Sequence, residues 1–193
     1  DTPMGLLITE TYAKFKRLYD AETIHKMSRG DDPLDFDELY VSKKGGDSAR
    51  LRDAPGPMII IAGSGMVTGG RIINHLVQGG LSDERNTLLF VGHQSVGTPG
   101  RRIQEAARAG GGAGASVWLD GEEVVVRAHI ETLRGLSAHA DRKELKAWLG
   151  AIPNVKRVAL HHGEVTAQND LVAFIEGKPL PPSSSSPAPT HKH

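Results

Sequence analysis

The sequence has no cysteine, no net charge and no long apolar run. Its 193 residues hold 23 Lys and Arg against 23 Asp and Glu. The lack of cysteine excludes disulfide frameworks, thiolate zinc sites and cysteine nucleophiles, and it leaves His, Asp and Glu as the available metal ligands. Because the charges balance, any contact with nucleic acid must come from locally clustered Arg and Lys.

No apolar run approaches the roughly 18 residues that a membrane-spanning helix needs. The first residues have neither the basic region nor the apolar stretch of a signal peptide. We therefore expect no membrane partner, and the lack of cysteine suits a location in the reducing cytoplasm. The chain begins at Asp1 in the middle of a sequence pattern, so we expect it to be part of a longer protein.

Short apolar runs alternate with segments of helical periodicity, which predicts an α/β fold with a parallel sheet. Strands are expected at 57–62, 87–91, 116–119, 123–130 and 157–160, and helices at 7–27, 71–77, 103–108, 141–149 and 166–176. The pair Asp120–Gly121 lies between two β-rich runs and predicts a hairpin. Residues 29–53 are expected to form a surface excursion with at most one short strand, at 40–42, and residues 178–193 a disordered tail.

A glycine-rich loop, Gly63–Gly70, joins an expected strand to an expected helix. Such a loop exposes backbone N–H groups at the positive end of a helix dipole, so it suits a phosphate, which Arg71 could also contact. A tight structural turn is the alternative. A dinucleotide-binding fingerprint fits poorly, because Thr68 stands where the third glycine should be and no acidic residue ends the next strand.

A second candidate phosphate-binding loop follows the strand expected at 87–91. It contains Thr98 and the adjacent Arg101 and Arg102. Adjacent guanidinium groups can hold a phosphodiester through charge-assisted hydrogen bonds, to which Thr98 would add a hydroxyl donor. The alternative is a solvated charge pair.

Two histidines lie in tight turns flanked by polar residues. His139 lies between Ser137 and Asp141, and His162 lies two residues before Glu164. Imidazoles in such turns serve in metal ligation and proton transfer near neutral pH. The alternative is that Asp141 simply caps a helix and that His139 and His162 are structural. His93 and His161 are weaker candidates, and the other histidines show no constellation: His25, His75, His129, His191 and His193.

Five motifs, taken together in their order and spacing, resemble the β-CASP branch of the metallo-β-lactamase superfamily. This family of RNA-processing nucleases includes archaeal and bacterial homologues of the eukaryotic pre-mRNA 3′-end endonuclease. The resemblance covers nearly everything except the tail. The matching residues are Asp1–Gly5 with Thr9, Glu10 and Tyr12, Ser64–Met66 with Gly69–Arg71 and His75–Leu76, Gly92 with Gly97–Thr98 and Gly100–Arg101, Leu136–Asp141, and His162–Glu164.

The resemblance implies a Rossmann-like, parallel-sheet β-CASP cap at 1–112 and the C-terminal part of a metallo-β-lactamase domain at 113–177, with RNA running between the two. It also implies two zinc ions in the complete enzyme, with His139 protonating the leaving oxygen and His162 as a zinc ligand. Ser137, Asp141 and Glu164 would support these two histidines. The residues expected to hold the RNA phosphates are Ser64, Gly65, Gly69, Gly70, Arg71, Thr98 and Arg101.

The sequence departs from the family pattern in its metal ligands: the motif His-x-His-x-Asp-His, the family's further His and Asp ligands and its motif A acid are not in it. A catalytic zinc needs about three protein ligands, so we expect this chain to be inactive without the N-terminal metal-binding half. That half and RNA are the expected partners, and a homodimer is left open. Two alternatives remain, a non-catalytic RNA-binding module on the same scaffold and a small Rossmann-type nucleotide-binding protein.

Overall fold

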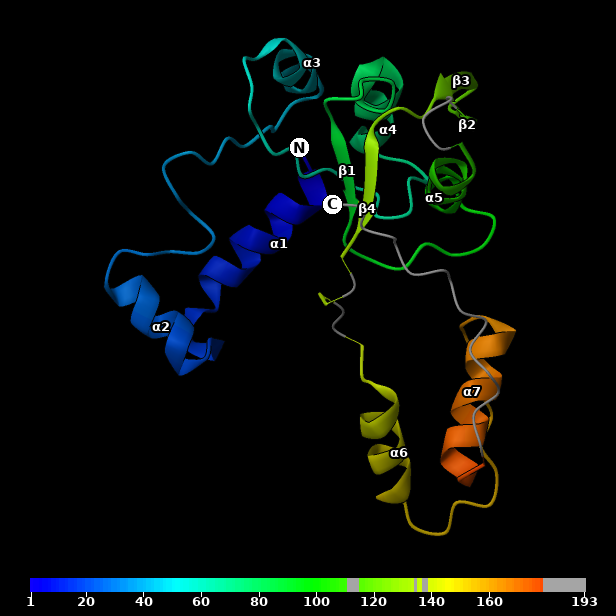
Figure 1. Cartoon of the computed structure of the whole chain (residues 1–193). Helices are drawn as coiled ribbons and strands as arrows, with labels where there is room; N and C mark the ends of the chain where they lie inside the picture. The colour runs from blue at the N-terminus through cyan, green and yellow to red at the C-terminus, as the bar shows by residue number, and fades with distance from the viewer. Residues whose placement is uncertain (111–114, 134, 137–138, 179–193) are drawn as a thin grey trace, which may run out of the picture. The chain divides into compact units, whose positions relative to one another are not determined.

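A computed structural model describes residues 1–110, 115–133, 135–136 and 139–178 (Figure 1). By its internal contacts the chain divides into two compact units, Asp1–Ser137 and Ala138–His193. The first unit contains α1 (Pro3–Lys14), the 3-10 turn η1 (Lys16–Leu18), α2 (Ala21–Ser28), α3 (Gly45–Asp53), α4 (Arg71–His75), the π-helical turn η2 (Leu76–Gly80), β1 (Thr87–Phe90), α5 (Pro99–Gly110), β2 (Ser116–Leu119), β3 (Glu122–Val125) and β4 (His129–Thr132). The second unit contains α6 (Arg142–Gly150) and α7 (Val165–Glu176).

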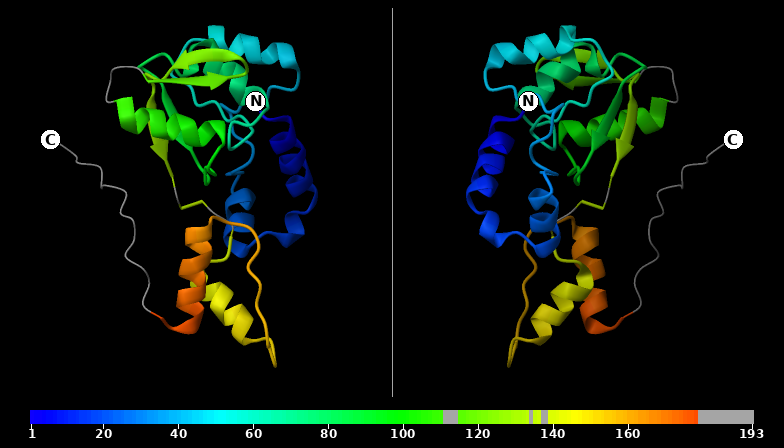
Figure 2. Two further views of the ribbon diagram at one scale, coloured as in Figure 1. Left: turned by 90° about the vertical axis from the view of Figure 1, so that its right-hand side faces the viewer. Right: turned by 90° about the vertical axis from the view of Figure 1, so that its left-hand side faces the viewer.

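The first unit is built on two small sheets. β1 and β4 pair in parallel, in a register that runs from Thr87 opposite His129 to Phe90 opposite Thr132. β2 and β3 form an antiparallel hairpin, and α5 packs against β2 and β4 (Figure 2). The predicted α/β class with a parallel sheet is confirmed.

The hairpin turn forms where the sequence predicts it. Asp120 and Gly121 have φ angles of 51° and 83°, the pair of positive values that a two-residue type I′ turn requires. The turn allows Val117 and Val124 to face each other across the strands on the buried side. Local turn chemistry is sufficient to specify this element.

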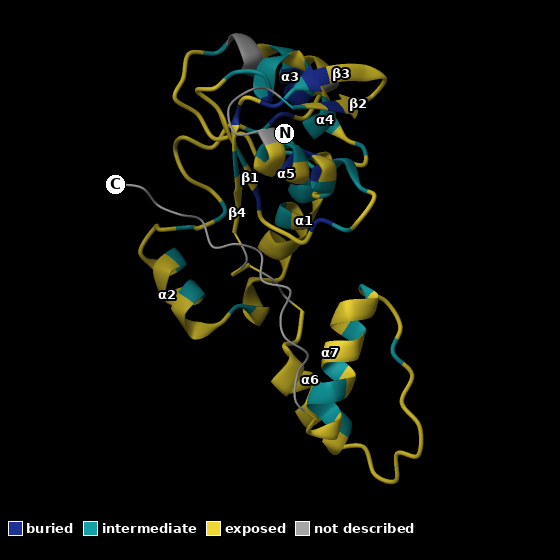
Figure 3. Ribbon diagram, turned by 45° about the vertical axis from the view of Figure 1, so that its right-hand side comes forward, coloured by how far each residue is buried: buried dark blue, intermediate teal, exposed yellow. Residues whose placement is uncertain are grey.

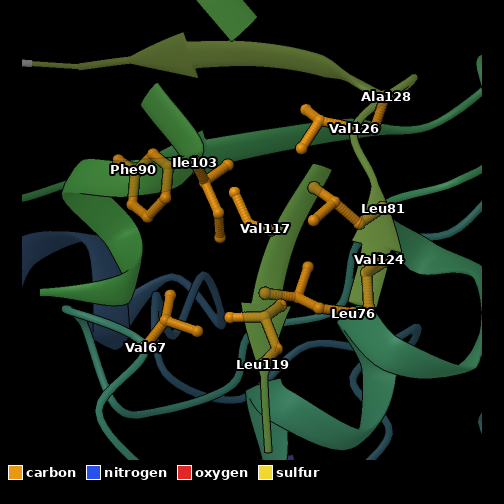
Figure 4. Close-up of a cluster of buried hydrophobic side chains, with 10 residues drawn as sticks. All are labelled: Val67, Leu76, Leu81, Phe90, Ile103, Val117, Leu119, Val124, Val126 and Ala128. Carbon is orange, nitrogen blue, oxygen red and sulfur yellow. The ribbon is translucent and has the colours of Figure 1, made fainter. Parts of the chain in front are cut away.

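Buried apolar side chains from the glycine loop, η2, β1, α5 and the hairpin form a single cluster (Figure 4). Its members are Val67, Leu76, Leu81, Phe90, Ile103, Val117, Leu119, Val124, Val126 and Ala128. Val67 is only 1% exposed, so the glycine loop is tied into this core by one of its own side chains. The core therefore holds the loop against β1 and α5.

The described residues of the second unit form an α-helical pair without a buried core. Among the described residues from 139 to 178, none is buried, and Figure 3 shows α6 and α7 as intermediate or exposed. Lys146 Nζ donates a hydrogen bond to the carbonyl oxygen of Phe174 at 2.9 Å. The Phe174 ring also lies 5.0 Å from the charged groups of Arg142 and Lys146, within the range of cation–π attraction.

The predicted strand 123–130 is two strands, β3 and β4, and two other predicted strands are absent. Residues 58–61 and 157–160 are not in strands, and Ile59 and Ile61 are 93% and 71% exposed. A strand needs a neighbour that pairs with its backbone N–H and C=O groups. The described strands pair only as β1 with β4 and β2 with β3, so none of them pairs with the apolar run at 58–61.

The predicted helices are confirmed in kind, although several bounds are wrong. The segment 7–27 is two helices rather than one, because α1 ends at Lys14 and α2 starts after Asp20, whose carboxylate accepts the N–H of Thr23. α5 starts at Pro99, four residues before the predicted helix at 103–108, since Pro is favoured in a first helical turn. In the predicted excursion 29–53, the short strand does not form and α3 was not anticipated.

Internal contacts group the hairpin and β4 with the preceding residues, so the first compact unit extends to Ser137. This is a division by packing, and the domain boundary at 112 stays a prediction. Apart from Lys178, the expected tail lies outside the described residues. Within the described part of the chain, no helix is long and apolar enough to cross a membrane.

Candidate nucleic-acid interface

The glycine loop has a fixed shape because it closes on itself. The N–H of Ser64 donates to the carbonyl of Gly69 at 3.0 Å, and the hydroxyl of Ser64 accepts the N–H of Thr68 at 3.0 Å. Gly70 has φ 79° and ψ −175°, a conformation that is essentially restricted to glycine. A Cβ there would lie 2.4 Å from the carbonyl oxygen of Gly63. The loop therefore requires glycine at position 70.

Several backbone donors of this loop point to no protein acceptor. Among described residues, the N–H groups of Gly65, Gly69 and Gly70 make no hydrogen bond. Gly65 and Gly70 are exposed and Gly69 is half-buried. Unpaired N–H groups grouped in one loop are suited to the oxygens of an anion. The structure thus leaves three of the predicted phosphate-binding residues available for that role.

Arg71 has partners of a different kind from those predicted. One terminal nitrogen donates to the carboxylate of Asp1, and to the carbonyl and hydroxyl oxygens of Ser42 at 3.2 and 3.1 Å. The other donates to the carbonyl of Lys43 at 3.3 Å. The guanidinium therefore joins the start of α4 to the chain's first residue and to the segment before α3. A phosphate contact by Arg71 stays a prediction that these bonds do not favour.

Asp1 is the centre of a buried polar cluster that the sequence did not reveal. Its side chain is 0% exposed. Besides Arg71, its carboxylate accepts the hydroxyl of Ser48 at 2.6 Å and contacts Nε2 of His75 at 2.8 Å. His75, which showed no constellation in the sequence, is thus a structural residue of this cluster. Contacts over 47 and 74 residues leave no local pattern that could have disclosed them.

In the second loop, the predicted phosphate-binding side chains form hydrogen bonds with residues close to them in the sequence. The hydroxyl of Thr98 donates to the carbonyl of Ser95 at 2.7 Å and accepts the N–H of Arg101 at 3.3 Å, so it caps the start of α5. Arg101 Nε donates to Glu105 at 2.7 Å, one helical turn away. An exposed pair of this type is weak, so Arg101 can exchange its partner, whereas Thr98 is held as a cap.

The structure brings the two loops together. The N–H of Gly100 donates to the carbonyl of Met66 at 3.1 Å. Nε2 of Gln94 donates to the carbonyl of Gly65 at 2.8 Å, and Gln94 is 3% exposed. The glycine loop and the first turn of α5 are therefore joined by these two hydrogen bonds. Sequence reasoning missed Gln94, because a glutamine after a strand carries no signal of its own.

Each of the two predicted histidines precedes a helix of the second unit. His139 is exposed and lies just before Asp141, which caps α6. The carboxylate of Asp141 accepts the N–H groups of Lys143 and Glu144 at 2.7 and 2.8 Å. Hydrogen bonds from the backbone of Glu144 and Lys143 lower the pKa of Asp141. Asp141 is thus a helix cap, as the structural alternative anticipated.

His162 is exposed and adopts a left-handed φ of 73°, which His tolerates better than most residues. Nε2 of Gln168 donates to the carbonyls of His162 and Gly163 at 3.2 Å each, which fixes this turn onto α7. Glu164 is the residue before α7, and its side chain makes no cap bond. Ser137 lies outside the described residues.

No group of three His, Asp or Glu side chains that could hold a metal ion occurs in the described part of the chain. The proton-transfer role of His139 and the zinc-binding role of His162 accordingly stay predictions. The imidazole of His162 is exposed, so it is accessible as one ligand of a metal ion. The described residues do not form a zinc site by themselves.

Comparison with known proteins gives two family models and several relatives. The Beta-Casp domain matches residues 1–103, and the Zn-dependent metallo-hydrolase RNA specificity domain matches residues 123–179. Ribonuclease TTHA0252 of Thermus thermophilus is 41% identical over 164 residues, which is 85% of this chain and 36% of the relative. Transcription termination factor FttA is 34% identical over 150 residues in Methanococcus maripaludis, which is 75% of this chain and 22% of the relative. The FttA of Pyrococcus abyssi is 36% identical over 132 residues, 65% of this chain and 19% of the relative. The chain thus spans about a third or less of the length of these relatives.

Proposed function

The chain belongs to the β-CASP family, and on this basis we propose that it supplies the RNA-binding surface and part of the active site of a zinc-dependent ribonuclease. The observation that carries the proposal is the contact between the two loops, formed by Gly100 N–H and the Met66 carbonyl at 3.1 Å. A contact of this kind lets two sets of donors act on successive phosphates of one strand. The names of the second family model and of the Thermus relative, an RNA specificity domain and a ribonuclease, support RNA as the ligand.

The RNA backbone would lie along these loops without regard to base sequence. The unpaired N–H groups of Gly65, Gly69 and Gly70 would donate to phosphate oxygens, with Ser64 holding the loop in shape. Arg101 would leave Glu105 for a phosphate, because a charge-assisted contact to a phosphodiester is stronger than an exposed ion pair. Contacts of this type set the register of the strand and carry no sequence information.

The two histidines would serve the chemical step. An imidazole at His139 would donate a proton to the leaving oxygen of the cleaved phosphodiester. His162 would contribute one ligand to a metal site completed by residues outside this chain. Zinc, when bound, would supply an activated hydroxide and charge stabilisation. The described residues do not hold the ion by themselves.

Replacing Arg101 by alanine tests the phosphate contact. We expect RNA affinity to fall about equally for all sequences and the slope of log K against log salt to flatten by about one unit, because one phosphate contact is lost. Fluorescence anisotropy with labelled single-stranded RNA at several salt concentrations measures both quantities. Glu105→Gln is the matched control: it removes the competing carboxylate and should leave the slope unchanged or steeper. An unaltered slope in Arg101→Ala would contradict the proposal.

The same chain is expected to leave RNA uncleaved. With one metal ligand where about three are needed, added zinc should give no hydrolysis of end-labelled RNA over hours. Cleavage that a chelator abolishes would show that this chain holds a complete site. RNA binding without cleavage even when the N-terminal metal-binding half is supplied would instead favour a non-catalytic RNA-binding module. Competition by a mononucleotide, with no RNA binding, would favour a nucleotide-binding protein.

A further inference from the structure

We propose that Gln94 is a positioning residue that holds the glycine loop against the first turn of α5, so that both loops bind one RNA strand as a single rigid surface. The inference rests on the proposed function and deepens it. It assigns a role to a side chain that would not itself touch the RNA.

The amide of Gln94 crosses from the end of β1 to the glycine loop. Nε2 donates to the carbonyl of Gly65 at 2.8 Å and lies 3.2 Å from the carbonyl oxygens of Gly92 and His93. The side chain is 3% exposed. Its donors are therefore committed to backbone carbonyls on both sides of the junction, and solvent or RNA does not reach them.

The oxygen of the same amide occupies a space that exists because residue 100 has no side chain. A Cβ on Gly100 would lie 1.8 Å from Oε1 of Gln94 and 3.1 Å from the carbonyl oxygen of Met66. Oε1 is buried and accepts no hydrogen bond from a described residue. The amide group is thus inserted between the glycine loop and α5, in the space left by the missing side chain of Gly100.

Rigid spacing of the two loops matters for a ligand that contacts both. A strand whose phosphates contact two independent loops must order each loop on binding, and the ordering entropy subtracts from affinity. Loops that are already fixed relative to each other avoid this loss. Gln94 therefore acts on RNA affinity through the loops, as does the Gly100 N–H bond to Met66.

The test compares Gln94→Met with Gln104→Met in the full chain. Gln104 is a second buried glutamine of the same unit, 8% exposed, whose Nε2 donates to Oγ1 of Thr132 at 2.9 Å, away from both loops. We expect Gln94→Met to weaken binding of labelled single-stranded RNA several-fold and to speed hydrogen exchange of the Gly100 amide. The salt slope should stay the same, because no charged group that neutralises a phosphate is removed. Gln104→Met should leave both affinity and exchange unchanged, even if it lowers the melting temperature.

Gly100→Ala is a second variant, which fills the space that the amide group of Gln94 occupies. The added methyl group would displace the amide of Gln94, so binding and exchange should change in the same direction as in Gln94→Met. In a Gln94→Ala background the space is empty, and Gly100→Ala should then have a much smaller additional effect. Circular dichroism establishes that each variant is folded.

The outcomes separate the inference from the function on which it rests. If the unmodified chain binds no RNA, the proposed function fails, and the Gly100 exchange rate still decides whether Gln94 joins the loops. If the chain binds RNA and folded Gln94→Met binds it with the same affinity, the positioning role is overturned. Equal losses in Gln94→Met and Gln104→Met would overturn it as well, because they would indicate a general packing effect.

Discussion

Replacing Arg71 by methionine is expected to lower the free energy of unfolding by about 3–5 kcal/mol, the usual cost of removing one partner of a buried ion pair. Methionine keeps much of the apolar stem but leaves the carboxylate of Asp1, 0% exposed, without its guanidinium partner. Three further hydrogen bonds, to Ser42 and Lys43, are lost with it. Urea denaturation followed by circular dichroism measures the change.

Arg101→Met is the matched control for this loss. Arg101 and Glu105 have side chains 31% and 55% exposed, and exposed pairs of this kind contribute about 0–1 kcal/mol. Asp1→Asn combined with Arg71→Met should recover part of the stability, because the unpaired charge is then gone. Equal losses in the two single arginine variants would mean that the Asp1 cluster is not a buried ion pair in solution.

Gly70→Ala should both destabilise the chain and abolish RNA binding by the glycine loop. The residue has φ 79° and ψ −175°, and an added Cβ would lie 2.4 Å from the oxygen and 2.8 Å from the carbon of the Gly63 carbonyl. Strain and overlap together are expected to cost about 2–4 kcal/mol. The closing bond from Ser64 to Gly69 would be disturbed at the same time. Thermal melting and RNA anisotropy measure the two effects.

The neighbouring glycine provides the control. Gly69 has an ordinary φ, and a Cβ added there would meet no heavy atom within 4 Å. Gly69→Ala should therefore change stability by less than about 0.5 kcal/mol and leave the loop's shape intact. If both alanine variants behave alike, the loop does not adopt the described conformation.

Elements with local signals were predictable from the sequence. Asp120–Gly121 sets the hairpin turn, and Asp141 with Glu144 forms the capping box that starts α6. These features need only neighbours in the chain. The apolar runs at 58–61 and 157–160 carry the composition of buried strands, but pairing depends on distant backbone that a short window does not contain. Their interpretation as strands was wrong for this reason.

The candidate site shows the same division between local and distant information. Glycine content identified the loop and its N–H groups, which the structure leaves available at Gly65, Gly69 and Gly70. The partners of Arg71 and Gln94 lie 70 and 29 residues away, and no spacing rule connects them. An arginine at the start of a helix suits a phosphate and a buried carboxylate equally well, and only the fold distinguishes the two.

The helical pair of the second unit has a calorimetric consequence. The heat capacity of unfolding reflects the apolar surface that becomes newly hydrated, and no described residue from 139 to 178 is buried. Melting of α6 and α7 in this chain should therefore add little to that heat capacity. The heat-capacity difference between the folded and unfolded chain would report mainly on the residues around Phe90 and Ile103.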